Sequence, residues 1–290
     1  MHGSYFSEIE KGDIISASLF LIIIFSIILS LVILKWLFPK RVSTSLLKGL
    51  IVASGILTIW EILSFLNLLN SVFLPPPSRI FSNIVYLWSI GFLQPQIFST
   101  LYRLFYAFIL ALFSALPLGI LISYFSRRFS YIESLVNAAR VVPAPAWLPL
   151  SVLWFGIGHA SAIFIIWLAC FFPIFLNTVA GVSKAEPTQV ETVLTFGGNR
   201  LDVLVEVILP VSYQHILTGA RIGIGIGWIT LVTAELASVD IGAGLGWMIS
   251  DSRILLDMTT VISGIVILGM FGMLTDTLLK KLEGLVQGWS

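Results

Sequence analysis

Charge is the property this sequence has least of. Only 11% of its 290 residues are charged, whereas a typical soluble domain carries about 25%. Hydrophobic residues make up 58% of the chain, and the mean hydropathy is +1.02. A chain with so little charge is predicted to be an all-α polytopic membrane protein. Its net charge of +1 argues against a nucleic-acid partner.

Cysteine and the common catalytic motifs are also scarce. The single cysteine, Cys170, lies in an apolar run and is predicted to be a buried, inert thiol. The three histidines, His2, His159 and His215, are far apart in the chain, so no metal site is predicted. The sequence contains no phosphate-binding loop, no HExxH and no GxSxG. We therefore expect no catalytic residues and no enzyme activity in this chain itself.

Long apolar runs, in contrast, are abundant, and seven of them approach the roughly 20 residues that a membrane span needs. Basic residues near positions 35–48, 127–128, 184 and 280–281 mark the cytoplasmic ends of these runs. This pattern predicts an external N-terminus and a cytoplasmic C-terminus. The first run is not expected to be a removable signal, because it lacks a basic start and a small-residue cleavage site. The predicted spans are 14–38, 46–69, 97–125, 142–155, 160–182, 213–237 and 258–279.

Two helices that do not span the membrane are also expected. Residues 130–140 are predicted to form a short cytoplasmic helix. A mildly amphipathic stretch at 80–88 is expected outside, lying along the interface. The aromatic residues of this stretch and one that follows it suit the level of the headgroups. They are Phe81, Tyr86 and Trp88 within the stretch and Phe92 after it.

Prolines and glycines interrupt several of these spans. The prolines are expected to break the spans, a pattern common in proteins with a pathway through them; they are Pro117, Pro143, Pro145, Pro149 and Pro173. Gly219, Gly223 and Gly227 recur every four residues. This spacing indicates close helix packing or, alternatively, the lining of a pore.

Ionisable residues within spans are costly and therefore become candidates for function. Glu61 and Arg103 are either functional, reach the interface, or belong to a buried pair such as Arg103 with a carboxylate. Arg221 is a candidate residue of a pathway or its gate, or else it reaches the interface or belongs to a buried pair. Glu235 is a candidate gate or docking residue, or else a helix cap. The glycine-rich loop after it is either a turn or a docking point for a soluble partner, through Gly242, Gly244 and Gly246.

The stretch 184–213 is polar and lies between two spans. Pro187 suits the first turn of a helix, where its missing N–H group would be unpaired in any case. Glu191 follows early enough for its charge to complement the helix dipole. The next apolar residues recur at helical spacing and form one stripe; they are Val190, Val193 and Leu194. The stretch is thus either an exposed amphipathic helix that contacts a partner or a solvated loop.

The end of this helix is marked by two glycines. Gly197 and Gly198 can adopt positive φ angles and stop a helix. A second short helix is predicted over 200–209, and Pro210 is expected to end or kink it. Because the surrounding charges place the stretch inside the cell, both short helices are expected on the cytoplasmic side.

Spacing within this stretch resembles a known motif. Glu191, Gly197, Val207, Leu209 and Pro210 match E-A-A-x3-G-x9-I-x-L-P, the EAA motif of permease subunits of ABC importers. The chain resembles more narrowly the nitrate, sulfonate, taurine and bicarbonate group, from about residue 60 to 289. The two alanines of the motif are replaced by Thr192 and Val193. Further matching stretches are 74–80, 142–158, 171–182, 208–223 and 234–236.

The resemblance implies a type I ABC importer transmembrane domain with a six-span core in 46–290, preceded by an extra span in 1–45. It implies a homodimer in the bacterial inner membrane, two cytoplasmic ATP-binding subunits that hold ATP and Mg, and an external solute-binding protein. Glu191 is expected to pair with a basic group on the ATPase or to cap its own helix. The residues implied in coupling are Pro187, Val190, Glu191, Val193, Leu194, Gly197, Gly198, Leu209 and Pro210.

Two other classes of protein remain open from the sequence. A secondary carrier or channel would work without an ATPase, but it predicts inverted repeats and ionisable residues near the middle of the membrane. No clear repeat is present. A membrane scaffold gives no reason for so many prolines within spans. For an importer the solute is expected to be small and anionic, with Arg221 as the interior candidate to attract it.

Overall fold

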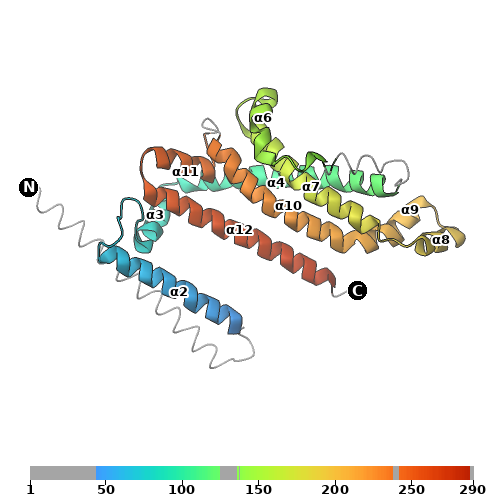
Figure 1. Ribbon diagram of the computed structural model, residues 1–290, viewed down its shortest axis with the longest axis horizontal. Helices are drawn as coiled ribbons and strands as arrows, with labels where there is room; N and C mark the ends of the chain where they lie inside the picture. The colour runs from blue at the N-terminus through green and yellow to red at the C-terminus, as the bar shows by residue number, and fades with distance from the viewer. Residues whose placement is uncertain (1–43, 125–135, 137, 238–241, 288–290) are drawn as a thin grey trace, which may run out of the picture. The chain divides into compact units, whose positions relative to one another are not determined.

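The computed structural model describes residues 44–124, 136, 138–237 and 242–287. The predicted span 14–38 and most of the predicted helix 130–140 lie outside these residues. All regular structure in the described part is helical (Figure 1). The elements are α2 (Thr44–Phe65), α3 (Pro77–Ser89), α4 (Leu93–Tyr124), the 3₁₀ turn η1 (Ala144–Trp147), α6 (Leu148–Phe155), α7 (His159–Val182), α8 (Pro187–Thr195), α9 (Arg200–Val203), the π turn η2 (Leu204–Ile208), α10 (Leu209–Ala237), α11 (Leu245–Ile254) and α12 (Met258–Gln287).

Five helical segments in the described part are long and apolar enough to cross a membrane: Lys48–Phe65, Leu93–Ser123, His159–Val182, Arg200–Ala237 and Met258–Lys281. They confirm five of the six spans predicted there. A full-length span over 142–155 is not found: the run forms the short apolar helix Ala144–Phe155, made of η1 and α6, which falls short of the roughly 20 residues that a span needs. The predicted change of side between α4 and α7 is retained, because the two helices run parallel. Arg103 near the start of α4 bonds to His159 at the start of α7, and Ser123 at the end of α4 bonds to Ser183 after the end of α7.

The described residues fall into two units, those of 44–94 with 251–265, and those of 95–250 with 266–287. In the first unit, the buried Glu61 on α2 accepts hydrogen bonds from Ser78, 3.0 Å from its N and 2.7 Å from its Oγ. Ser78 lies in the first turn of α3, where backbone N–H groups need an acceptor. Glu61 therefore caps α3, a role that the sequence did not predict.

The predicted helix 80–88 is confirmed as part of α3, and its aromatic residues Phe81, Tyr86 and Trp88 are exposed. Its other side is tied to α12, because Asn83 Nδ2 lies 3.1 Å from the Oγ1 atom of Thr260 and 3.1 Å from the Oγ atom of Ser263. The position of this helix along the membrane interface stays a prediction.

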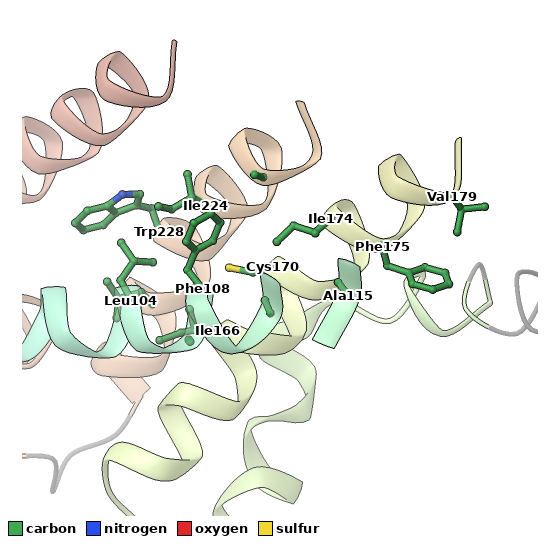
Figure 2. Packing of buried hydrophobic residues seen from close by; sticks show 14 residues of the cluster. Leu104, Phe108, Ala115, Ile166, Cys170, Ile174, Phe175, Val179, Ile224 and Trp228 are labelled. Carbon is green, nitrogen blue, oxygen red and sulfur yellow. The ribbon is translucent and has the colours of Figure 1, made fainter. Parts of the chain in front are cut away.

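The second unit is organised around α7 and α10, which run side by side (Figure 1). A buried apolar cluster from α4, α7 and α10 fills the space between them. Figure 2 shows Leu104 and Phe108 of α4 facing Ile166 and Cys170 of α7. Cys170 is fully buried and has no disulfide, which confirms a buried thiol.

Small residues permit the close approach of α7 and α10. A Cβ atom on Gly227 would lie 2.8 Å from Cys170 Sγ, and one on Gly223 would lie 3.0 Å from the Cys170 carbonyl oxygen. A Cβ atom on Gly219 would lie 2.7 Å from Asn177 Cβ. These distances are too short for any larger residue without a shift, so the predicted role in close packing is confirmed.

Two of the predicted helix breaks are not found. Pro117 lies inside α4 and Pro173 lies inside α7, and both helices continue past them. A proline removes one helical hydrogen bond, but packing of neighbouring helices keeps such a helix intact in a membrane. Pro143, Pro145 and Pro149, in contrast, do stand where regular α-helix is interrupted, in and around η1.

Pro210 does not end a helix either. The segment from Arg200 to Ala237 is continuous through α9, η2 and α10. Pro210 is the second residue of α10 and follows η2 directly. A proline ring clashes with the carbonyl four residues earlier, here that of Glu206, and the wider π turn over Leu204–Ile208 moves this carbonyl away. The predicted short helix 200–209 is therefore the first part of a long one.

Candidate functional site

The start of α8 is defined by local sequence. Glu186 precedes the helix and Pro187 is its first residue, as predicted. The Glu186 N–H group donates to Gln189 Oε1 over 3.2 Å, which satisfies a backbone group that the helix leaves open. Glu191 takes no part in this cap and is exposed. The cap alternative for Glu191 is thus wrong, and its pairing with a partner stays a prediction.

The end of α8 is a Schellman motif. Gly197 N donates to Leu194 O over 3.1 Å, and Gly198 N donates to Val193 O over 2.9 Å, the two bonds that define this helix ending. Gly197 has a φ of 88°, so its lack of a side chain is required by the backbone. Gly198 is required for another reason, because a Cβ atom there would lie 2.6 Å from Val193 Cγ1.

The next helix begins at once. Asn199 Oδ1 accepts from Leu201 N over 2.7 Å and from Asp202 N over 3.2 Å, while Asp202 Oδ2 accepts from Asn199 N over 2.7 Å. This reciprocal capping box starts α9. The connection between α8 and α9 is therefore short and held at both ends, and α8 follows the end of α7 beside the start of α9 (Figure 1).

The predicted apolar stripe of α8 is partly packed and partly exposed: Val190 and Val193 contact a buried cluster, whereas Leu194 is exposed. The cluster is made of Val182, Val203 and Ile208. Val193 therefore joins α8 to the start of the long helix, which explains a bulky residue where the motif has alanine. Thr192 points to solvent, and its Oγ1 donates to Thr188 O over 2.7 Å; nothing in the structure explains why it replaces alanine.

Beyond this cluster, exposed apolar side chains occur on α8, the residues after it, α9 and η2. We call these residues together the distal patch; they are Leu194 (46% exposed), Phe196 (89%), Leu201 (69%) and Val205 (60%). Beside it lies a groove of about 660 Å³ whose lining includes Leu194, Glu191 and Arg200. Exposed apolar residues next to charged ones are typical of a surface that contacts another protein.

A buried ion pair lies near the C-terminal end of α10, away from the end that follows α9 and η2. Glu235 on α10 and Arg103 on α4 are both fully buried, and Arg103 Nη1 lies 2.5 Å from Glu235 Oε1. Thr100 Oγ1 donates to both carboxylate oxygens at 3.0 Å. Arg103 Nε donates to His159 Nδ1 over 3.1 Å. The predicted pairing of Arg103 with a carboxylate is confirmed, with Glu235 as the partner.

This ion pair also holds the glycine-rich loop. Arg103 Nη2 donates to the carbonyl oxygen of Ala243 over 2.6 Å, and Gly246 N donates to Glu235 Oε2 over 2.8 Å. Gly246 lies in the first turn of α11, so Glu235 caps that helix rather than its own. We call Arg103, Glu235 and the bound residues Ala243–Gly246 the outer clasp.

The glycines of the loop differ in their surroundings. A Cβ atom on Gly244 would lie 2.6 Å from Arg103 Nη1, and one on Gly246 would lie 2.6 Å from Glu235 Cβ. Both glycines are buried, whereas Gly242 is exposed. Because the clasp leaves no room for side chains at Gly244 and Gly246, these two glycines serve packing. A docking role for the loop stays a prediction.

Arg221 is joined to a residue that sequence reasoning missed. Arg221 Nε lies 2.9 Å from Asp276 Oδ1, and Lys280 Nζ lies 2.7 Å from Asp276 Oδ2. Asp276 and Lys280 are four residues apart on α12, the spacing at which helical neighbours pair, and this spacing is the signal that marks Asp276. Arg221 is therefore paired within the chain, with a carboxylate that it shares with Lys280.

Comparison with known proteins places this geometry in a family. Residues 107–287 match the model of the binding-protein-dependent transport system inner membrane component. The chain is 33% identical over 261 residues to the taurine transport system permease protein TauC of Escherichia coli, covering 88% of this chain and 94% of TauC. It is 32% identical over 183 residues to the nitrate import permease protein NrtB of Leptolyngbya laminosa, covering 63% of this chain and 65% of NrtB.

A solved structure supports the same assignment at the level of the fold. A chain of the MetNI methionine ABC transporter in an inward-facing conformation superposes with a TM-score of 0.55 and 17% identity, covering 67% of this chain and 95% of that chain. This likeness confirms the expected type I importer fold. The long helical spans, the motif around α8 and the family match agree, and the chain belongs to the family of binding-protein-dependent transport system inner membrane components.

Proposed function

We propose that this chain is the permease subunit of an ATP-driven importer that takes up a small anionic solute delivered by an external binding protein. Family membership and the permease relatives support the importer class. A solute with an anionic group is supported by the names of the relatives TauC and NrtB, which refer to taurine, a sulfonate, and to nitrate. The observation that carries the proposal is α8 with its distal patch, an exposed apolar surface on a chain that otherwise forms membrane helices.

The distal patch is the surface that contacts a cytoplasmic ATP-binding subunit in this proposal. Burying exposed apolar side chains such as Phe196 and Leu201 stabilises an interface, and the adjoining charges of Glu191 and Arg200 suit its rim. ATP and Mg belong to that partner. Because α8 is packed on the start of the long helix through Val193, movement of the ATPase is transmitted to α10.

The outer clasp is the second moving part in this proposal. It joins α10 to α4 and to the loop before α11, at the far end of the same helix that α8 contacts. A shift of α10 therefore acts on the Glu235–Arg103 pair, which gives Glu235 the role of a gate. Gly242, the exposed glycine of the loop, is the contact offered to the external binding protein.

The assembly follows from the same proposal. One permease copy pairs with a second copy in the inner membrane, with two ATP-binding subunits inside and the binding protein outside. The C-terminus of the chain is cytoplasmic and the N-terminus is external, as the basic clusters indicate. This orientation places α8 on the side of the ATP-binding subunits and the outer clasp on the side of the binding protein.

Gly197 offers a direct test of the coupling role. Valine at this position is strained by the φ of 88°, so Gly197→Val is expected to distort the end of α8 and reduce both co-purification with the ATP-binding subunits and ATP-dependent uptake. Gly55→Val is the matched control, because Gly55 on α2 has open space and no positive φ. Undiminished assembly and uptake in Gly197→Val contradict the coupling role. Uptake by the chain alone without ATP supports a carrier instead.

A further inference from the structure

A cavity of about 400 Å³ lies between α7, α10 and the segment that leads into η1. Its polar lining side chains are Arg140 and Asn177, and much of the remaining wall is apolar, including Phe172, Leu176 and Ile222. Its volume falls in the range of pockets that hold small organic molecules, about 300–1,000 Å³. The cavity shares no lining residue with the distal patch or the outer clasp.

The cavity lies within the depth of the membrane helices. Its wall on α7 extends from Ala169 to Asn177, which are 13 and 5 residues before the helix ends at Val182. These positions correspond to about 20 and 8 Å along the helix axis from that end. A charged side chain beside this wall is costly when it faces lipid, so it marks a water-filled or ligand-binding space.

Arg140 supplies that charge. The ion pairs found in the described part of the chain join Arg103 to Glu235 and bring Arg221 and Lys280 to Asp276; none of them includes Arg140. Arg140 is an exposed residue, and a guanidinium has five N–H donors that can bind an anion. Arg221, which the sequence favoured as the residue that attracts an anion, is already paired with the carboxylate of Asp276.

Asn177 is held in place to act beside Arg140. Its Nδ2 atom donates to the Pro173 carbonyl over 2.8 Å, and a Cβ atom on Gly219 would lie 2.7 Å from Asn177 Cβ. The base of the side chain is therefore confined between α7 and α10. An amide nitrogen carries two hydrogens, so one donor of Asn177 remains for a ligand.

From these features we propose that the cavity binds an organic monoanion that has a short apolar tail and no ammonium group. Arg140 and Asn177 donate to the anionic head, and Phe172, Leu176 and Ile222 contact the tail. The described residues of the lining include no aspartate or glutamate, so no carboxylate among them pairs with an ammonium group. An inorganic anion would leave the apolar wall without a partner. The role of the cavity in transport rests on the proposed import function, whereas binding itself does not.

Binding is tested on the full-length chain in detergent by saturation-transfer NMR with ethanesulfonate as the probe. We expect saturable binding to the natural chain and about tenfold weaker binding to Arg140→Gln, because a hydrogen bond to a charged group is lost. Ile222→Trp is expected to abolish the signal, because the indole fills the cavity while Arg140 is retained. Arg253→Gln, at an exposed arginine outside the lining, is the matched control and should bind as the natural chain does.

Competing ligands test the chemical class. Taurine, which adds an ammonium group, and nitrate, which lacks a tail, are each expected to bind about tenfold more weakly than ethanesulfonate. Equal binding of taurine or nitrate overturns the proposal, as does unchanged ethanesulfonate binding in both Arg140→Gln and Ile222→Trp. Absence of saturable binding to the natural chain overturns it as well.

Uptake by the assembled importer separates this inference from the proposed function. In the complete complex, Arg140→Gln should lower ethanesulfonate uptake about tenfold while ATP hydrolysis stimulated by the binding protein is retained. Unchanged uptake in this variant overturns the role of the cavity in transport and leaves the importer function standing. If the natural complex shows no ATP-dependent uptake of any solute, the proposed function fails. Whether the cavity binds the organic anion is then decided by the NMR experiment alone.

Discussion

Glu235 and Arg103 form a fully buried ion pair although they are 132 residues apart in the chain. Their remaining bonds reach Thr100, His159 and the backbone of the loop before α11. A buried pair whose polar atoms are satisfied in this way joins four elements at one point, α4, α7, α10 and α11. The C-terminal end of α10 is therefore held by specific bonds rather than by apolar packing alone.

Removing one charge of this pair is expected to destabilise the chain strongly. Glu235→Gln leaves the Arg103 charge buried without its carboxylate, which costs about 3–5 kcal/mol. The double variant Arg103→Met with Glu235→Leu removes both charges and should recover much of this loss. Thermal unfolding in detergent, followed by circular dichroism, measures both. A double variant that is no more stable than Glu235→Gln contradicts this account.

Contact between α7 and α10 gives a second prediction. Gly227→Ala places a methyl group 2.8 Å from Cys170 Sγ, and such overpacking costs about 1–3 kcal/mol. Adding Cys170→Ala removes the sulfur and should restore part of the stability. Gly225→Ala is the matched control, because a Cβ atom there meets nothing within 4 Å, and it should stabilise the helix by up to about 1 kcal/mol. Equal unfolding temperatures for the two glycine variants would show that close packing is not the reason for Gly227.

Binding of the ATP-binding subunit should depend on the distal patch. Phe196 is 89% exposed, so Phe196→Ala should leave the unfolding temperature of the chain alone nearly unchanged. In the complex it should weaken association by about 2 kcal/mol or more, as expected for an aromatic anchor. Phe113→Ala, at a residue 79% exposed on α4, is the control. Co-purification with the ATP-binding subunits measures the effect, and equal recovery of both variants counts against the patch.

The α11 cap provides a fourth prediction. Gly246→Ala places a methyl group 2.6 Å from Glu235 Cβ, which should disturb the carboxylate that accepts from Gly246 N. We expect a loss of about 1–3 kcal/mol in unfolding experiments. Gly272→Ala on α12, where a Cβ atom meets nothing within 4 Å, should not destabilise the chain. If Gly246→Ala is as stable as Gly272→Ala, the clasp tolerates side chains and its packing is looser than described.

Local chemistry explains what the sequence predicted well. The start of α8 at Pro187 and its end at Gly197 depend on residues only a few positions apart. Five apolar runs of sufficient length appear as helices because a span is defined by its own composition. The spacing of Gly219, Gly223 and Gly227 indicated a contact for the same reason, although it did not name the partner helix.

The errors of prediction arose at prolines. The run 142–155 has the hydropathy of a span but forms η1 and α6, since its prolines interrupt the helix. Pro210 was expected to end or kink a helix, and the helix does not end there, because the π turn η2 carries it past this proline. Composition cannot distinguish a proline that breaks a helix from one that a wider turn accommodates.

The sequence by itself determined the class of the protein, its main spans and the exposed helix α8, because hydropathy, caps and motif spacing are local properties. The tertiary structure alone decided which charges meet. It paired Arg103 with Glu235 and Arg221 with Asp276, and it placed Arg140 beside Asn177 in a cavity. Pairing requires helices far apart in sequence to lie side by side, and the energy of a buried charge depends on that neighbour rather than on its own position in the chain.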